Sequence, residues 1–343
     1  MNGTPWYQNA ETDQHQILSS RVRLARNIKK YRFQQKMTPQ DATQMVQEAK
    51  DALTRVNTRL FHHMDMQGLG ESDRKVFLEK HIVSPEFLKG TLPRGLLISE
   101  DQNISVMLNE EDHIRIQAVH PGGGLAEALA KANQVDDLIE ESVEFAFHPE
   151  YGYLTACPTN TGTGLRASFM IHLPCLDSGD QAQLKNLLPT INKFGITLRG
   201  IYGEGTAPMG SIYQISNQTT LGKSEDDIIH GLKNVTKSVI EQENAAKEKM
   251  LTAGRDEMED KIYRAYGNLA YCRKITAKEA MELLSQVRLG YLAKLLDKPK
   301  PQKQIYQIMM EIQPGHLMRM NGYEMNEAER DTARAKYLRE IFV

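Results

Sequence analysis

Residues 104–118, with the sequence ISVMLNEEDHIRIQA, decide which fold class the chain predicts. Every second residue is aliphatic from Ile104 to Leu108, and the same alternation returns from Ile114 to Ala118. This period of two is typical of β-strands with one buried face. The polar stretch between them is too short for a helical crossover, so we expect the two strands to pair antiparallel.

Further strands and helices surround this hairpin. Thr38-Pro39 is typical of a helix start, because Thr caps the first turn and Pro fits the first helical position. Apolar residues at helical spacing then predict a helix over residues 39–58, and another helix is expected over residues 124–144. Additional strands are predicted over residues 94–99, 167–173, 196–200 and 211–216. The predicted fold class is α+β, with a mostly antiparallel sheet flanked by helices.

The last third of the chain predicts only helices. Two capping boxes, Ser224 with Asp227 and Thr276 with Glu279, each precede a run with helical apolar spacing. The end of the first of these helices is rich in Glu, Lys and Ala and almost bare of apolar residues. We therefore predict a domain boundary near residue 247, followed by a C-terminal all-helical domain.

Composition excludes several classes of protein. The chain has 343 residues with 42 Lys plus Arg against 44 Asp plus Glu, so its net charge of −2 excludes a nucleic-acid binder of the basic-tail type. The sequence contains no long uncharged apolar run of the kind that predicts a membrane span. Its first residues lack the basic and apolar regions of a signal peptide. Three cysteines without a CxxC motif favour a reducing compartment. We expect a cytoplasmic protein that binds neither nucleic acid nor membrane.

Polar residues that a purely structural protein does not need concentrate in five segments, four of which supply arginines. These segments are 19–23 (SSRVR), 79–81 (EKH), 109–115 (NEEDHIR), 157–166 (CPTNTGTGLR) and 199–204 (RGIYGE). Arg21 and Arg23 are two apart, so in an extended segment both point to one face, and Arg115 falls on the polar side of its strand. Several arginines converging on one site favour a multiply charged anion such as a nucleoside polyphosphate.

The sequence does not match the common nucleotide-binding motifs. Gly222-Lys223-Ser224 resembles the end of a P-loop, but the first glycine of that motif would fall at Asn217. Gly122-Gly123-Gly124 lacks the GxGxxG spacing, and the HRD and DFG motifs of protein kinases are missing. A bound ATP must therefore be held by the arginine cluster.

Four motifs in order, SSRVRLARN from Ser19, NEEDHIR from Asn109, CPTNTGTGLRAS from Cys157 and RGIYGE from Arg199, resemble the catalytic domain of the phosphagen (guanidino) kinases. The resemblance covers about two-thirds of the chain. It implies a phosphagen-kinase-like fold and three parts. These are an N-terminal extension (1–16), a catalytic domain (17–246) and a helical domain (247–343) for substrate docking, dimerisation or regulation.

The resemblance also implies the site residues and their roles. Glu111 and Glu204 match two catalytic carboxylates that grip a guanidinium group, and Mg²⁺ accompanies ATP with no metal ligand from protein side chains. A protonated guanidinium is a poor nucleophile, so two carboxylates can orient its nitrogen and one can accept the proton. ATP binding is assigned to Ser19, Ser20, Arg21, Val22, Arg23, His81, Arg115, Arg166, Ala167, Ser168, Phe169, Met170, Arg199, Gly200, Ile201, Tyr202, Gly203 and Glu204.

Departures from the small-substrate enzymes point to one branch of that family. The SSRVR motif begins at Ser19, so the N-terminal helical domain of those enzymes is expected to be missing, and Met170 and Tyr202 replace a histidine and an arginine. These features resemble the bacterial protein-arginine kinases. So does RDTARA (330–335), which resembles that branch's allosteric phosphoarginine-binding element, with Arg330, Asp331, Arg334 and Ala335 as its residues. The other interpretation is a surface ion pair between Asp331 and Arg334.

The resemblance predicts an allosteric kinase that transfers the γ-phosphoryl group of ATP to arginines of proteins, in bacterial stress response and protein quality control. Its implied partners are proteins with exposed arginines, a zinc-binding activator protein, a Clp-type unfoldase or protease, a stress-response repressor and a second copy of the chain. Two alternatives stay open: a kinase for free guanidino compounds, and a non-catalytic adaptor that binds phosphoarginine.

Overall fold

The computed structural model describes residues 5–55, 61–66, 68–178, 182–201 and 208–343. These residues form two compact units with interleaved segments. The first unit consists of Met1–Trp6, Ser20–Ser168 and Ser216–Leu232, and the second of Tyr7–Ser19, Phe169–Ile215 and Lys233–Val343.

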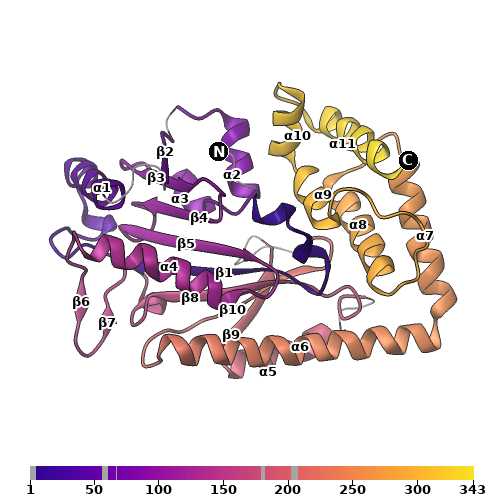
Figure 1. The fold of residues 1–343 in the computed structure, drawn as a ribbon, viewed down its shortest axis with the longest axis horizontal. Helices are drawn as coiled ribbons and strands as arrows, with labels where there is room; N and C mark the ends of the chain where they lie inside the picture. Colours follow the sequence, from indigo (N-terminus) through magenta and orange to yellow (C-terminus); the bar gives the residue numbers. More distant parts are fainter. Residues whose placement is uncertain (1–4, 56–60, 67, 179–181, 202–207) are drawn as a thin grey trace. The chain divides into compact units, whose positions relative to one another are not determined.

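The described elements follow the order shown in Figure 1. The strands are β1 (Ile17–Arg26), β2 (Phe61–Met64), β3 (Gly95–Ser99), β4 (Ile104–Leu108), β5 (Ile114–Pro121), β6 (Phe147–His148), β7 (Gly152–Tyr153), β8 (Leu165–His172), β9 (Ile196–Gly200) and β10 (Ile212–Asn217). The helices are α1 (Pro39–Thr54), α2 (Glu71–Glu79), α3 (Pro85–Lys89), α4 (Leu125–Glu140), α5 (Ala182–Lys193), α6 (Glu225–Ala253), α7 (Arg255–Tyr271), α8 (Ala277–Leu292), α9 (Ile305–Glu311), α10 (Pro314–Asn321) and α11 (Glu327–Phe342).

The predicted hairpin forms the middle of the main sheet. Its strands pair antiparallel with the apolar residues opposite one another, for example Val106 with Ile116, which confirms the prediction. β2, β3 and β4 also pair antiparallel, and the whole strand order is β2-β3-β4-β5-β1-β8-β10-β9. Strands β1, β8 and β10 each have residues in both units. The α+β class with a mostly antiparallel sheet is thus confirmed.

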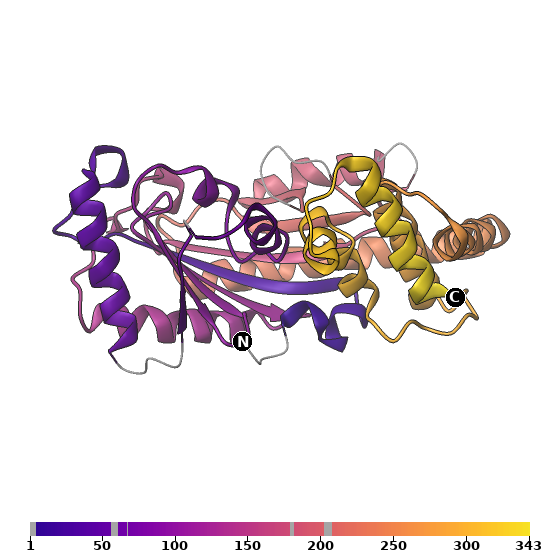
Figure 2. The same ribbon diagram turned by 90° about the horizontal axis from the view of Figure 1, so that it is seen from above.

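Helices cover both faces of the sheet in the first unit. On one face α4 packs against β5, and α1 packs against α4 and β3 (Figure 2). The start of α1 is as predicted, because the Thr38 hydroxyl accepts a hydrogen bond from the Asp41 N–H at 3.1 Å. On the other face Leu96 and Ile98 of β3 pack with Phe77 of α2 and Phe87 of α3 in one apolar cluster. This second face carries the site described below.

A glycine allows β1 and β8 to lie close together. Gly164 has φ +65°, and its carbonyl accepts a hydrogen bond from the Ala25 N–H at 3.0 Å. A Cβ at this position would lie only 2.6 Å from the Ala25 carbonyl oxygen. Both the positive φ and the short distance require glycine, which places Arg166 two residues into β8 beside β1.

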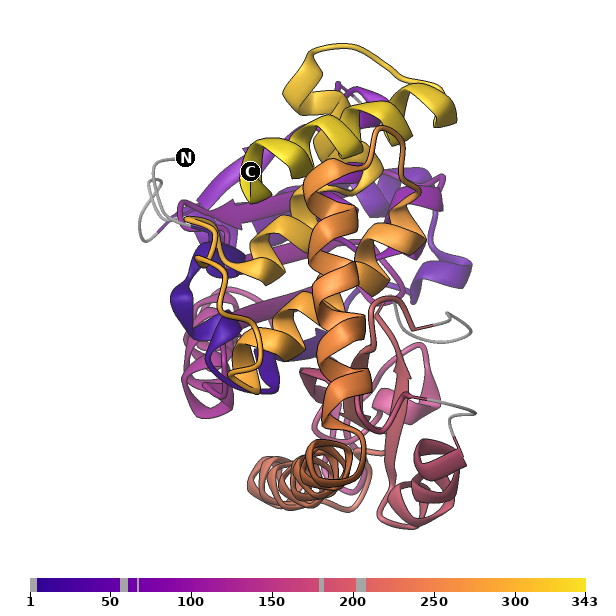
Figure 3. The same cartoon turned by 90° about the vertical axis from the view of Figure 1, so that its right-hand side faces the viewer.

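The C-terminal part is helical, as predicted. α7 packs against α8 and α11, and α9 packs against α8 and α10 (Figure 3). The capping threonine of α8, Thr276, accepts a hydrogen bond from the Glu279 N–H. Helix α6 continues through residue 247, and the domain division near that residue stays a prediction. No helix of the described residues is long and apolar enough to span a membrane.

A buried ion pair joins α4 to β1 on the face opposite the site. Arg26 is 1% exposed, and its Nη2 and Nε donate to the Asp136 carboxylate at 2.7 and 3.1 Å. Its Nη1 donates to the Thr163 carbonyl, and its guanidinium carbon lies 3.6 Å from the centre of the Tyr153 ring. Removing one partner of such a pair leaves an uncompensated charge in the interior.

We predict that Asp136→Ala lowers the free energy of unfolding by about 3–5 kcal/mol, because Arg26 loses its counter-ion. Urea denaturation measures this change. The matched control is Glu144→Ala, which breaks the exposed pair with Lys29 and should cost at most about 1 kcal/mol. Equal losses in the two variants would contradict the prediction.

Candidate active site

The turn between β4 and β5 is held rigidly by its own polar residues. Asn109 has φ +63°, a conformation that asparagine tolerates better than most residues, and its N–H donates to the His113 carbonyl at 2.7 Å. Asn27 of the segment after β1 binds the C-terminal end of the turn, because its amide donates to Asp112 at 2.7 Å and accepts from the His113 N–H at 2.9 Å. This network fixes the two glutamates that lie between.

His113 contributes as a neutral ring. Its Nδ1 accepts a hydrogen bond from the Ile28 N–H at 3.0 Å, so the proton resides on Nε2, which donates to the Arg32 carbonyl at 2.9 Å. Burial lowers the pKa of this histidine and favours the neutral form. Asn109, Asp112 and His113 therefore spend their described hydrogen bonds on bracing the turn.

The two glutamates of the turn share one arginine. Arg115 donates from Nη1 to Glu110 at 2.7 Å and from Nη2 to Glu111 at 3.0 Å. Glu110 is buried and also accepts hydrogen bonds from the Ser84 hydroxyl at 2.6 Å and from the Glu111 N–H at 2.7 Å. The Glu111 side chain is 43% exposed. Glu110 is thus the anchor, and Glu111 is the carboxylate that remains accessible.

The environment of Glu111 prepares it to accept a proton. Burial raises the pKa of its carboxyl group, Arg115 opposes this shift, and the charges of Asp112 and Glu110 add to it. A carboxylate with a raised pKa is a stronger base than an ordinary surface glutamate.

Four arginines gather around one point of the first unit. Burial lowers the pKa of the Arg23 guanidinium, and the positive charges of Arg21, Arg115 and Arg166 lower it further. The Arg23 Nε atom is buried and has no hydrogen-bond partner among the described residues. Clustered guanidinium groups repel one another, so an anion with several negative charges stabilises the arrangement. This cluster, formed by Arg21, Arg23, Arg115 and Arg166, has the charge and the donors to bind a polyphosphate.

His81 lies at the same cluster. It has φ +56° in the turn after α2, its ring centre is 6.5 Å from that of Trp6, and its carbonyl accepts a hydrogen bond from Gln117 of β5. Burial and the charge of Arg21 lower its pKa to about 3. The ring is therefore neutral at physiological pH, as suits contact with an uncharged part of a nucleotide.

The other predicted ATP-binding residues divide into three sets. Side chains buried within strands belong to Ser19, Ser20, Val22, Ala167, Ser168, Phe169 and Met170; Ser20, for example, donates to the Gly122 carbonyl at 2.7 Å. Arg199, Gly200 and Ile201 lie at the end of β9 in the second unit, where Arg199 is partly exposed. Tyr202, Gly203 and Glu204 lie outside the described residues. Nucleotide contacts by all of these residues stay predictions.

The RDTARA segment begins in the first turn of α11. Arg334 is 1% exposed and donates to Asp331 at 2.7 Å, to the Ile312 carbonyl at 2.9 Å and to the Ile275 carbonyl at 2.8 Å. The predicted i,i+3 pair exists, but it is buried rather than on the surface. Arg330 is partly exposed and donates to the Met325 carbonyl at 2.6 Å, and Ala335 is buried. Phosphoarginine binding by this segment stays a prediction.

Sequence reasoning missed the residues that hold the site in place. Glu110, Ser84 and Asn27 have no distinctive motif spacing relative to one another, because they meet only through the fold. One available signal was the doubled glutamate at Glu110 and Glu111, since only one of two adjacent side chains faces a given side.

Comparison with protein families places this fold and site in a class. The family described as ATP:guanido phosphotransferase, C-terminal catalytic domain, matches residues 42–246. Among solved structures, the taurocyamine kinase of Schistosoma mansoni is 26% identical with a TM-score of 0.63, over 78% of this chain and 39% of that one. A lombricine kinase is 22% identical with a TM-score of 0.61, over 72% of this chain and 70% of that one, and shares the fold. The protein is a guanidino phosphotransferase.

Relatives over the full length narrow the class. The protein-arginine kinase of Halalkalibacterium halodurans is 43% identical, covering 98% of this chain and 94% of its own length. That of Bacillus subtilis is 42% identical over 98% of this chain and 92% of its own. The family described as protein-arginine kinase McsB C-terminal domain matches residues 255–343. The chain belongs to the protein-arginine kinase family and is an enzyme of that type.

We predict that Glu110→Ala lowers kcat about a hundredfold, because Arg115 and the Glu111 backbone lose their anchor and the reacting groups shift. Steady-state kinetics with ATP and a protein acceptor measure the effect. The control is Glu141→Ala, an exposed glutamate at the end of α4, which should leave kcat unchanged. A kcat of wild-type size in the Glu110 variant would show that the anchor is dispensable.

Proposed function

We propose that the protein transfers the γ-phosphoryl group of ATP to an arginine side chain of a protein, which yields ADP, N-phosphoarginine and a proton. The observation that carries the proposal is the position of Glu111, whose accessible carboxylate is bonded to one of the four clustered arginines. This arrangement sets a base for a guanidinium beside a binding site for phosphates. A phosphagen-type transfer needs both.

The residues divide the chemistry between them. Arg21, Arg23, Arg115 and Arg166 hold the phosphates and neutralise the charge on the transferring group. Glu111 orients the acceptor guanidinium and takes up its proton as the new N–P bond forms and the bond to the leaving ADP oxygen breaks. We assign the second carboxylate to Glu204 and further phosphate contacts to Arg199, on the strength of the motif that contains them.

Mg²⁺, when bound, supplies further neutralisation of the phosphate charge. No group of three or more histidine, cysteine, aspartate or glutamate side chains able to hold a metal occurs in the described part of the chain. We propose that the ion enters as a companion of the nucleotide, whose phosphates the arginine cluster binds.

The wider role rests on resemblance to the family. We propose that the enzyme acts in the cytoplasm in stress response and protein quality control. Its proposed partners are a zinc-binding activator, a Clp-type unfoldase or protease, a stress-response repressor and a second copy of itself. Free thiols at all three cysteines are consistent with a reducing compartment. The helical domain from residue 247 is proposed to dock substrate, to dimerise or to regulate, with Arg330, Asp331, Arg334 and Ala335 binding phosphoarginine.

We predict that the purified protein, incubated with Mg²⁺ and γ-labelled ATP, labels an unfolded protein acceptor but not free arginine. The label should be lost in mild acid, because the N–P bond of phosphoarginine hydrolyses there, whereas phosphate esters persist. Glu111→Gln keeps the shape of the side chain and should lower the rate about 10²–10⁴-fold, the usual contribution of a positioned base.

The same experiment separates the alternatives. Label on free arginine as well as on protein would favour a kinase for free guanidino compounds. Nucleotide binding without any label would favour a phosphoarginine-binding adaptor. Acid-stable label on the protein would contradict the proposed bond.

We also predict an acidic limb in the pH–rate profile that depends on Glu111. Its pKa is raised by burial, so the carboxyl group becomes protonated at a higher pH than the ordinary glutamate value of 4.5, and the rate falls as pH decreases through the raised pKa. ADP release is the suitable readout, since the phosphorylated product is acid-labile. The residual rate of Glu111→Gln should lack this limb. A limb at the same pH in both proteins would assign it to another group.

A further inference from the structure

One buried arginine of the helical part binds the end of β8 and the segment before β1, and these two strands carry Arg21, Arg23 and Arg166. Arg288 of α8 is 1% exposed. Its Nη1 donates to Nδ1 of His172, the last residue of β8, at 2.8 Å, and its Nη2 donates to the carbonyl of His15 at 2.6 Å. His15 lies two residues before β1. A single guanidinium thus connects β8 with the entry to β1.

The histidine in this network has a defined tautomer. An arginine can only donate, so His172 Nδ1 is an acceptor and Nε2 carries the proton, which it donates to the Ser285 hydroxyl of α8 at 2.7 Å. Burial and the charge of Arg288 lower the pKa of His172, so the ring stays neutral. The His172 N–H also donates to the Gln16 carbonyl at 2.8 Å, which ties β8 to the same segment before β1.

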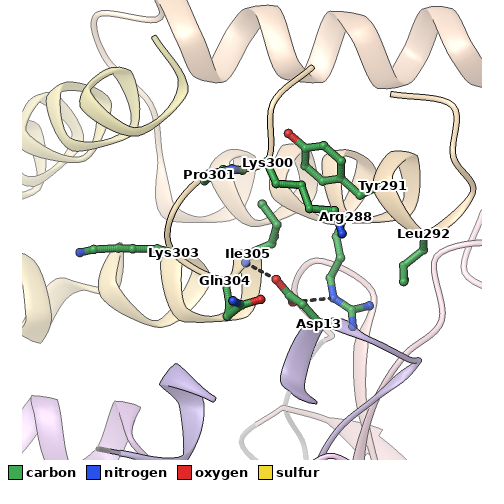
Figure 4. Close-up of a pocket in the computed structure, with 9 residues that line it drawn as sticks. All are labelled: Asp13, Arg288, Tyr291, Leu292, Lys300, Pro301, Lys303, Gln304 and Ile305. Carbon is green, nitrogen blue, oxygen red and sulfur yellow. Dashed lines mark hydrogen bonds and ion pairs between the residues drawn. The ribbon is translucent and has the colours of Figure 1, made fainter. Parts of the chain in front are cut away.

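Asp13 continues the network into α9. Figure 4 shows its carboxylate between Arg288 and the first turn of α9. Arg288 Nε donates to Asp13 at 3.1 Å, and the N–H groups of Ile305 and Tyr306 donate to the same carboxylate. Asp13, Arg288 and Ile305 border a pocket of about 80 Å³. The segment that precedes β1 is therefore fixed by two helices at once.

The hydrogen-bond partners of Arg288 differ in location from those of Arg334, another buried arginine of the helical part. The described side-chain hydrogen bonds of Arg334 go to Ile275, Ile312 and Asp331, which all lie in the C-terminal helical part. Arg288 directs its described bonds to residues before β1 and at the end of β8. If Arg288 served only to stabilise the helices, its hydrogen bonds would not need to reach residues outside them.

The residues that Arg288 binds are connected through β1 and β8 to the arginine cluster. His15 lies six residues before Arg21 and His172 six residues after Arg166, a distance of roughly 20 Å along an extended strand. Paired strands are stiff along their length, so a shift at these ends displaces the arginines that the strands carry.

We propose that Arg288 is a positioning residue for nucleotide binding, which acts with Asp13 and His172 to set the placement of β1 and β8 and hence of Arg21, Arg23 and Arg166. The proposal rests on the assignment of these three arginines to the phosphates of ATP. It makes the C-terminal helical part a support of the nucleotide site.

The test compares Arg288→Met with wild type in the full-length protein. Equilibrium binding of Mg–ADP by calorimetry should weaken about tenfold, a typical coupling between separate sites, and the KM for ATP should rise in parallel. The KM for the protein acceptor should not change, because the Glu111 turn has no described contact with Arg288. Ser285→Ala and Asp13→Asn remove single parts of the network and should shift Mg–ADP binding in the same direction by less.

Two further variants distinguish positioning from plain stability. Arg339→Met removes another arginine of the helical part, whose guanidinium donates to the Cys272 carbonyl and contacts neither strand through its described bonds. It should lower the melting temperature without changing Mg–ADP affinity. Arg288→Lys keeps a positive charge beside Asp13 but lacks the fork that holds His15 and His172 together, so binding should stay weakened.

Unchanged Mg–ADP affinity in folded Arg288→Met or Arg288→Lys protein would overturn the proposal. If Arg288→Met does not fold, Ser285→Ala and Asp13→Asn decide, and wild-type affinity in both would overturn it equally. Because nucleotide binding is measured without transfer, this result is independent of whether the wild-type enzyme phosphorylates protein arginines.

Discussion

Repulsion among like charges is the constraint on which the site depends. Arg21, Arg23, Arg115 and Arg166 come from three strands and lie close enough to lower the pKa of one of their number. Two unit charges 4 Å apart repel by about 4 kcal/mol at an effective dielectric constant of 20. Such a cluster persists only where the backbone holds it and where carboxylates offset part of the charge. The sheet supplies the first condition and Glu110 the second.

Other contacts of the first unit hold the strands that carry these arginines. Gly164 lets β8 approach β1, and the ion pair of Arg26 with Asp136 fixes β1 from the face opposite the cluster. The turn between β4 and β5 places a buried glutamate and an accessible one next to each other. Glu110 therefore offsets part of the arginine charge from a buried position, while the Glu111 carboxylate remains partly exposed. Two adjacent residues of the same type have different roles because the backbone points their side chains to different surroundings.

Sequence patterns predicted six of the eight strands described in the main sheet, all except β1 and β2. Alternating aliphatic residues on both sides of the 109–113 turn fixed the antiparallel pairing, and the strand at residues 196–200 was predicted with its observed ends. Such patterns are local, because burial of one strand face requires apolar residues at a period of two. Ordered motifs also named the arginines and Glu111 as candidates, since phosphate and guanidinium chemistry demands those residue types, and their roles stay predictions. The predicted helix at residues 124–144 was longer than the observed α4, because ends of helices depend on packing.

By itself, the sequence determined the α+β class, the helical C-terminal part and the family to which the chain belongs, because each is encoded in residue types and short spacings. Only the tertiary structure decided that Glu110 anchors Arg115, that the pair of Asp331 with Arg334 is buried, and that Arg288 joins the end of β8 to the segment before β1. These contacts join segments up to 273 residues apart or depend on which side chain is buried. Local residue spacing does not determine either property, because both arise from the way distant elements pack together.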